Sequence, residues 1–131
     1  MSRQILLPEG APRPVSYYSH GIRVGPVLYS AGQTARDASG RLVGIGDVQQ
    51  QAERAFYNLS LVLHQAEMRF DDVVRLNIFA RNSADLPIIM NVKEQFFAQH
   101  APAMTIAVVV GLAYPEYALE VEAIAVSDEF Q

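Results

Sequence analysis

The chain has no cysteine, a single lysine and no long hydrophobic run. Without cysteine it can form no disulfide, no thiolate metal site and no cysteine nucleophile. Its ten basic and fourteen acidic side chains give a net charge of −4. This balance argues against a surface for nucleic acid or an anionic membrane, because phosphate binding needs clustered positive charge. We therefore expect small molecules or protein partners.

No stretch approaches the roughly 20 apolar residues of a membrane-spanning helix. The first ten residues also lack the basic start and apolar run of a secretion signal. The length of 131 residues, 50% of them hydrophobic, suits one domain that can bury its own core. We predict a soluble, cytoplasmic protein with a single domain over residues 1–131.

The spacing of apolar residues predicts an α+β fold with a single sheet and both helices on one face of it. The elements expected in chain order are an edge strand at 4–7, a hairpin of 17–24 and 27–31, a helix from Asp47, a strand at 73–80, a helix from Asp85, and strands at 103–112 and 119–126. Asp47 is a suitable helix cap, with Gln50 three positions on in capping-box register.

Two of these elements carry patterns that fix the direction of their side chains. In strand 73–80, the alternation places on one face Val74, Leu76, Ile78 and Ala80. The second helix has Pro87 in its first turn and is expected to end at Pro102. Its apolar stripe is Ile89, Val92, Phe96 and His100.

The run 103–112 is rich in β-branched residues and has no polar face, so such a strand must be covered on both sides. We predict it to be the central strand of the sheet. With both helices on one face, the other face would expose more apolar surface than soluble monomers usually tolerate. This pattern predicts an oligomer whose subunits cover that face.

The run 119–126 alternates differently, because Leu119 and Val121 point one way while Glu120 and Glu122 point the other. Two carboxylates therefore share one face of a mostly apolar strand. Such a pair is often only a solvated strand face. It is also the most chemically suggestive feature of the sequence.

Several segments together resemble one known family. They are the hairpin around Tyr18, the turn Ser30-Ala31-Gly32-Gln33, the helix capped by Asp47, Phe96-Phe97, the entry Ala101-Pro102-Ala103 and the strand 119–126. Nearly the whole chain is similar to the Rid family of reactive-intermediate deaminases, the YjgF-like proteins. The resemblance implies a chorismate-mutase-like fold, and a homotrimer with its sheets facing inward and clefts between subunits. It further implies hydrolysis of enamines or imines to 2-oxo acids and ammonia, without a metal or organic cofactor.

The resemblance also assigns site residues one by one. Tyr18 and Glu120 match the family's pocket tyrosine and its water-activating glutamate, and Gly32 matches the glycine after the third strand. Deaminating members have an arginine directly after Pro-Ala, whose planar fork can hold the substrate carboxylate. Here that position is Met104, which cannot do so and either lines a more apolar pocket, the reading we favour, or belongs to the core.

Other positions of the implied cleft also differ from the family pattern. The serine before the Gly-Gln pair is Ala31 here, with Ser30 one residue early, and a small polar or cysteine position is Ile106. Tyr117, in the loop before Glu120, either forms part of the cleft rim or belongs to an ordinary loop. Tyr18 is either a substrate contact or an interface aromatic.

Two hypotheses follow from these residues. The first is a cofactor-free deaminase or hydrolase of an enamine, imine or related compound, with Glu120 as the catalytic residue that positions water, Tyr18 and Met104 shaping a hydrophobic cleft, and an altered specificity. The second is a non-catalytic trimer that binds a small metabolite or a protein partner in the same cleft. If a carboxylate is bound without an arginine at 104, the arginines to examine are Arg13, Arg23, Arg36 and Arg81.

Overall fold

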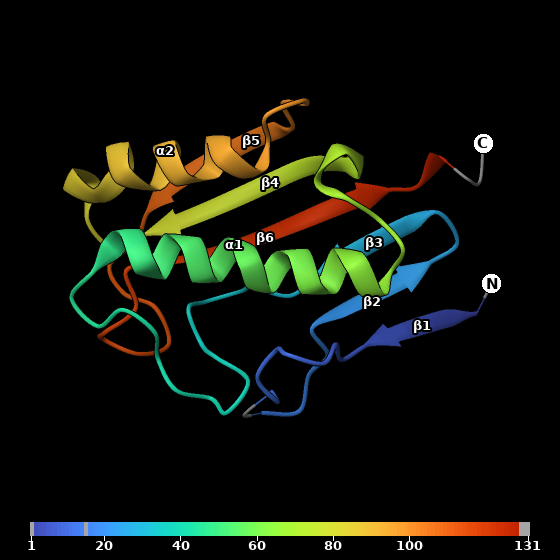
Figure 1. Ribbon diagram of the computed structural model, residues 1–131, viewed down its shortest axis with the longest axis horizontal. Coiled ribbons are helices and arrows are strands. Elements are labelled where there is room, and N and C mark those ends of the chain that lie inside the picture. The colour runs from blue at the N-terminus through green and yellow to red at the C-terminus, as the bar shows by residue number, and fades with distance from the viewer. Residues whose placement is uncertain (1, 15, 129–131) are drawn as a thin grey trace.

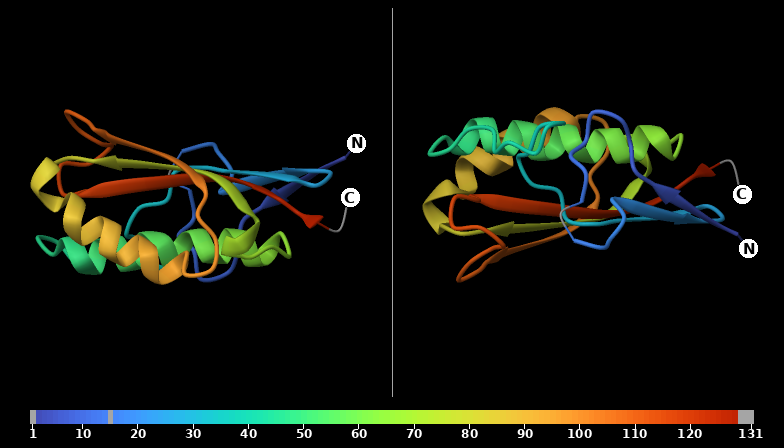
Figure 2. Two further views of the ribbon diagram at one scale, coloured as in Figure 1. Left: turned by 90° about the horizontal axis from the view of Figure 1, so that it is seen from above. Right: turned by 90° about the horizontal axis from the view of Figure 1, so that it is seen from below.

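The computed structural model describes residues 2–14 and 16–128, and within these residues the chain forms a six-stranded sheet with two helices on one face (Figures 1 and 2). The strands are β1 Arg3–Leu6, β2 Gly21–Val24, β3 Val27–Ser30, β4 Val73–Ala80, β5 Ala103–Val108 and β6 Leu119–Val126. The helices are α1 Val48–Gln65 and α2 Leu86–Phe96, with 3-10 turns at Phe70–Asp72 and Ser83–Asp85. The α+β architecture predicted from the sequence is confirmed.

The strand order is β1-β2-β3-β6-β4-β5, so that β6, the last strand along the chain, lies between β3 and β4. β4 and β5 are parallel and α2 connects them, whereas the other neighbouring strands are antiparallel. The predicted hairpin is present as β2 and β3, although β2 begins only at Gly21.

Of the two helices, α1 contributes more buried apolar side chains to the core between the sheet and the helices. Asp47 caps it as predicted, because the Asp47 Oδ1 accepts a hydrogen bond of 3.1 Å from the Gln50 backbone N–H. The buried apolar side chains of this helix are Ala52, Ala55, Phe56, Leu59, Val62 and Leu63. Among the described residues, neither helix is long and apolar enough to cross a membrane.

Strand β6 shows the predicted alternation in full. Leu119, Val121, Ala123 and Ala125 are buried beneath the helices. Glu120 and Glu122 point to the opposite side, which no helix covers (Figure 2). We call this side of the sheet the open face. The prediction that one face is left uncovered within the chain is therefore confirmed.

Strand β5 corrects the prediction of a central strand at 103–112. It ends at Val108 and forms the edge of the sheet, because the crossover through α2 places it beside β4 and no further strand formed by the described residues lies beyond it. Val110 is fully exposed. Met104 and Ile106 pair with Leu76 and Ile78 of β4 and pack against the core on the helix side.

Two smaller predictions are also wrong. A β-bulge between Val73 and Arg75 shifts the register of β4, so Val73 is buried whereas Val74 is 45% exposed. Helix α2 ends at Phe96, before Pro102, and His100 is exposed outside it. Asp85 makes no side-chain cap bond, because a 3-10 turn capped by Asn82 leads into the helix.

The positions of β5 and β6 predict unequal costs for the same substitution. Val121 in β6 is fully buried, so Val121→Ala should lower the free energy of unfolding by about 1 to 3 kcal/mol. Val108 in β5 is 51% exposed, so Val108→Ala should cost less than about 1 kcal/mol. Urea denaturation of both variants at one protein concentration measures the difference. Equal losses would show that Val108 is buried by contacts from outside this chain.

Candidate functional site

Three segments that are far apart in the sequence meet near the end of β3 and the start of β6. They are the segment before β2, the loop between β3 and α1, and the loop between β5 and β6 (Figure 1). Together they line a small hollow of about 50 Å³. The lining residues are Pro12, Arg13, Tyr18, His20, Gly32, Gln33, Thr34, Arg36, Gly40 and Tyr117.

The backbone of Gly32 lies close to the side chain of Glu120. A Cβ atom on Gly32 would lie only 2.5 Å from the Cδ of Glu120, so any other residue would displace the carboxyl group. The next residue, Gln33, fixes this approach through paired backbone hydrogen bonds with Val121, of 2.7 and 3.0 Å. Gly32 is therefore required for space beside the acid.

The environment of Glu120 favours its protonated form. Burial of the half-buried side chain raises the pKa of Glu120, and the neighbouring charge of Glu122 raises it further. A carboxylate whose pKa is moved towards neutrality is a better acceptor and donor of protons under ordinary conditions. Glu122 therefore contributes to the raised pKa of Glu120, its neighbour on the same face of β6.

Two tyrosines belong to this site, and Tyr18 interacts with both Tyr117 and Glu120. Burial raises the pKa of the Tyr18 hydroxyl, with smaller contributions in the same direction from Tyr117 and Glu120. The Tyr18 ring meets the ring of the buried His20 edge to face at 5.9 Å. Tyr117 is only 6% exposed. The structure therefore brings together four of the residues that the sequence pointed to: Tyr18, Gly32, Tyr117 and Glu120.

Arg36 joins this group, although the sequence indicated it only as one of four arginines to examine. Its Nε donates a hydrogen bond of 2.5 Å to the Tyr117 hydroxyl. Its guanidinium carbon lies 4.8 Å from the centre of the Tyr114 ring and 5.2 Å from that of Tyr117. The two rings and the cation form a compact cluster.

The other three arginines differ in their surroundings. Arg23 is buried and donates to the backbone oxygens of Gly25 and Ala66. Arg81 donates to the backbone oxygen of Pro115. Arg13 is exposed at the rim of the small hollow.

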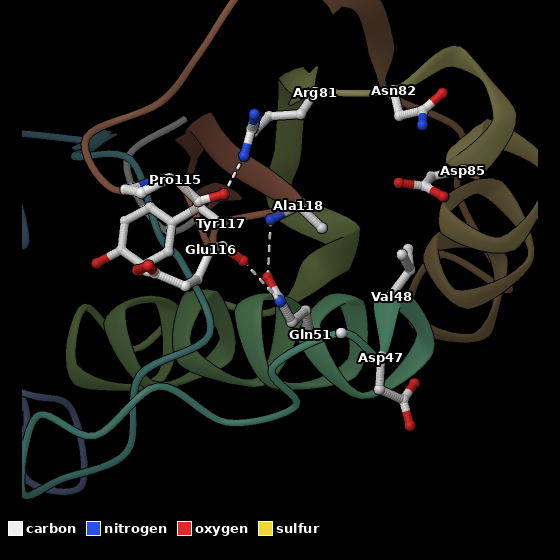
Figure 3. Close-up of a pocket in the computed structure, with 11 residues that line it drawn as sticks. Asp47, Val48, Gln51, Arg81, Asn82, Asp85, Pro115, Glu116, Tyr117 and Ala118 are labelled. Carbon is white, nitrogen blue, oxygen red and sulfur yellow. Dashed lines mark hydrogen bonds between the residues drawn. The ribbon is translucent and has the colours of Figure 1, made fainter.

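A row of polar side chains on α1 holds both site loops, and sequence reasoning missed it. The Gln51 Nε2 donates to the backbone oxygens of Gly44 and Glu116 at 3.1 and 3.0 Å, and its Oε1 accepts from the Ala118 N–H at 2.8 Å (Figure 3). These last two bonds flank Tyr117 on both sides. Gln51 therefore fixes the backbone on which Tyr117 stands.

Asn58 and Arg54 do the same for the loop of Arg36. The Asn58 Nδ2 donates to the backbone oxygens of Thr34 and Arg36, and the Arg54 Nε donates to that of Arg36. Positions 51, 54 and 58 are three and four residues apart, so their side chains lie on one side of the helix. In the sequence, this spacing of polar residues beside the apolar stripe of α1 is the feature that could have indicated the row.

Ser30 and Ala31 lie in a different, larger hollow of about 690 Å³. Apolar and aromatic side chains form much of its wall, among them Ile5, Leu7 and Tyr29, and Tyr18 belongs to the walls of both hollows. The Ser30 Oγ accepts a hydrogen bond of 2.9 Å from the Ala123 N–H, so this hydroxyl is engaged with β6. A further hollow of about 330 Å³ lies beside Tyr117, between α1 and the β5–β6 loop (Figure 3).

Met104 and Ile106 are not brought to Glu120 within one chain. They lie on the helix side of β5, whereas Glu120 lies on the open face of β6, and β4 separates the two strands. In the described part of the chain, no group of three or more His, Asp or Glu side chains is arranged to hold a metal ion.

The sequence and the fold of this chain match one family. A sequence profile described as Endoribonuclease L-PSP matches residues 8–127. The chain is 33% identical over 126 residues to a 2-iminobutanoate/2-iminopropanoate deaminase of Dermatophagoides farinae, covering 95% of this chain and 96% of that protein. It is 30% identical over 125 residues to the 3-aminoacrylate deaminase RutC of Acinetobacter baylyi, covering 95% and 98%.

Solved structures agree with this match. The structure of E. coli TdcF with bound serine has a TM-score of 0.88 and 27% identity, covering 95% of this chain and 99% of that one. The YjgF gene product of E. coli has a TM-score of 0.86 and 26% identity, covering 94% and 98%. The chain belongs to this family, the Rid or YjgF-like family.

The raised pKa of Glu120 predicts a pH dependence of stability. Folding disfavours the ionised carboxylate, so the wild type loses stability as the pH rises from the usual glutamate range through the raised pKa of Glu120. Glu120→Gln lacks this loss, so over that pH interval its free energy of unfolding should rise relative to that of the wild type. Above the interval the difference between the two proteins should stay constant. Unfolding free energies measured from about pH 4 to pH 8 at one protein concentration test this.

Glu122→Gln should reduce this pH dependence, because it removes one of its two causes. Glu53→Gln, on the exposed side of α1, serves as the control and should leave the dependence unchanged. A wild type that gains stability over Glu120→Gln as the pH rises would contradict the assigned direction of the pKa.

Proposed function

We propose that this protein is a cofactor-free deaminase that hydrolyses small enamines or imines, with Glu120 as its catalytic acid and base. The observation that carries the proposal is a half-buried carboxyl group with a raised pKa beside Gly32, next to a hollow walled by Tyr18 and Tyr117. The names of the two deaminases similar to this chain support it. The serine bound to TdcF supports a small amino-acid-like ligand.

The proposed reaction begins at the carbon of a C=N bond. The Glu120 carboxylate takes a proton from a water molecule as the water oxygen forms a bond to that carbon, and the imine nitrogen takes up a proton from solvent. Glu120 then passes its proton to the amino nitrogen of the resulting carbinolamine. The C–N bond breaks as ammonia leaves, and the carbinolamine hydroxyl gives its proton to solvent as it becomes the carbonyl oxygen. The products are ammonia and a carbonyl compound. Gly32 leaves room for the carboxyl group beside this path.

We further propose that the cleft is completed between subunits of a homotrimer, as the family resemblance implies. The open face carries exposed apolar side chains such as Ile5 and Tyr29, and β5 is an unpaired edge within the chain. Met104 and Ile106 are only half-buried at that edge, where a second chain can approach them. In this arrangement they would line the cleft of a neighbouring subunit, and Met104 in place of arginine would alter its specificity.

A non-catalytic binding protein is the second candidate. Met104 favours this second candidate, because a methionine side chain cannot form the two parallel hydrogen bonds by which an arginine guanidinium holds a carboxylate. The family description as an endoribonuclease does not suit this chain as well, since a net charge of −4 disfavours a polyanion. Action in the cytoplasm remains an expectation from the sequence.

The enzyme is distinguished from the binding protein by a panel of imines that an amino-acid oxidase generates in the same solution. The wild type should accelerate imine loss above the spontaneous rate, and Glu120→Gln should lower this acceleration about a hundredfold or more. Glu116→Gln, in the exposed loop, should retain full activity as the control. Equal activity of Glu120→Gln and the wild type would remove Glu120 from the mechanism.

The homotrimer predicts a mass in solution of three times the 14.5 kDa of the chain. Light scattering coupled to size-exclusion chromatography measures this mass directly. A well-folded monomer at about micromolar concentration would refute both the trimer and a cleft formed between subunits.

A further inference from the structure

Arg36 is a partly buried cation that has no carboxylate partner among the described residues. In the part of the chain that the structure describes, the one ion pair joins Arg69 and Asp71 at the surface. Removing a charged group from water is costly unless an opposite charge or a full set of hydrogen bonds compensates for it. The surroundings of Arg36 supply only part of that compensation, since they are neutral rings and backbone oxygens.

The guanidinium also has unused donors. Arg36 uses its Nε for the Tyr117 hydroxyl and its Nη1 for the Gly40 backbone oxygen, at 2.5 and 2.6 Å. A guanidinium has five N–H donors, so three remain, including both at Nη2. Among the described residues, no group accepts a hydrogen bond from Nη2. The side chain therefore keeps donors on two nitrogens, Nη1 and Nη2, that can bind an anion.

Arg36 is held in place before any ligand arrives. The rings of Tyr114 and Tyr117 pack against its guanidinium, while Asn58 and Arg54 fix its backbone oxygen. A side chain that is already ordered loses little entropy on binding, which strengthens the contact that it makes. This order distinguishes Arg36 from an ordinary surface arginine.

The hollow beside Arg36 has the charge that an anion needs. Arg13 and Arg36 line it, and no aspartate or glutamate is among its described lining residues. Its volume of about 50 Å³ suits a group of a few heavy atoms, and the polar residues Tyr18 and Thr34 are among those that line it. Gly32, also in the wall, lies directly against Glu120.

We propose that Arg36 binds the anionic group of the substrate in this hollow, from the loop between β3 and α1 and in place of an arginine at position 104. This inference rests on the proposed function and specifies its substrate class. The substrate is a small imine or enamine with a carboxylate held by Arg36 and its C=N carbon directed towards Glu120. An apolar side chain of that substrate can lie across Tyr18 in the larger hollow.

The main test compares two imines of similar size, one with a carboxylate and one without charge. Arg36→Gln should lower kcat/KM for the carboxylated imine about 10- to 100-fold and leave the uncharged imine nearly unchanged. Arg36→Lys should show a smaller selective loss, because it keeps the charge without the fork. Arg41→Gln, an exposed arginine of the same loop, should match the wild type for both.

A binding experiment separates recognition from turnover. Isothermal titration calorimetry uses 2-oxobutanoate, a carboxylate that cannot undergo deamination, and should show binding to the wild type. Arg36→Gln should bind it about 10- to 100-fold more weakly, the same factor as the expected loss of kcat/KM for the carboxylated imine. Retained turnover of the uncharged imine shows that Arg36→Gln is folded. If that variant does not fold, the selective loss in Arg36→Lys decides.

Each result bears on a different proposal. Unchanged turnover of the carboxylated imine by Arg36→Gln overturns this inference and leaves the deaminase intact. Equal losses for both imines also overturn it, because Arg36 would then only support the loop. Arg36-dependent binding of 2-oxobutanoate without any turnover supports the inference and refutes the deaminase. Neither turnover nor binding in the wild type overturns both.

Discussion

The position of β6 in the middle of the sheet is the constraint on which the rest of this structure depends. Its side chains alternate between the helix layer and the open face, so one strand has to supply both core and site. A shift of one residue in its register would bury Glu120 and expose Val121. The backbone pairing of Gln33 with Val121 fixes the same register for Gly32, so the acid and the space it needs are set together.

Helix α1 serves this arrangement from the other side. Its apolar side chains fill the core, while Gln51 and Asn58, also buried, bind the loops that carry Tyr117 and Arg36. Buried amide groups are tolerated when they have partners, and here the Gln51 amide and the Asn58 Nδ2 bond to backbone groups of these loops. The helix thus determines where two loops lie as well as how the sheet is covered.

The sequence predicted what depends on local chemistry. Asp47 as a cap, the bounds of β4 and the alternation of β6 follow from neighbouring residues, and all three are confirmed. The edge position of β5 was missed because strand order depends on the crossover, and the bulge at Val74 because a single extra residue leaves no mark in the alternation. The contact between Arg36 and Tyr117 joins residues 81 positions apart, so no local pattern could show it. The family resemblance supplied Glu120, Tyr18 and Gly32, whereas Met104 lies on the helix side of β5, away from Glu120 within this chain.

The place of β6 in the chain order has a consequence for how the protein folds. Strands β3 and β4 are complete well before β6 is synthesised, yet they do not pair with each other and both require β6 as their neighbour. The hairpin of β2 and β3 and the unit of β4, α2 and β5 can each form early from nearby residues. These two units become one sheet only when β6, which ends at Val126, inserts between β3 and β4. We therefore expect the insertion of β6, which forms contacts between residues far apart in the sequence, to be the last and slowest step of folding.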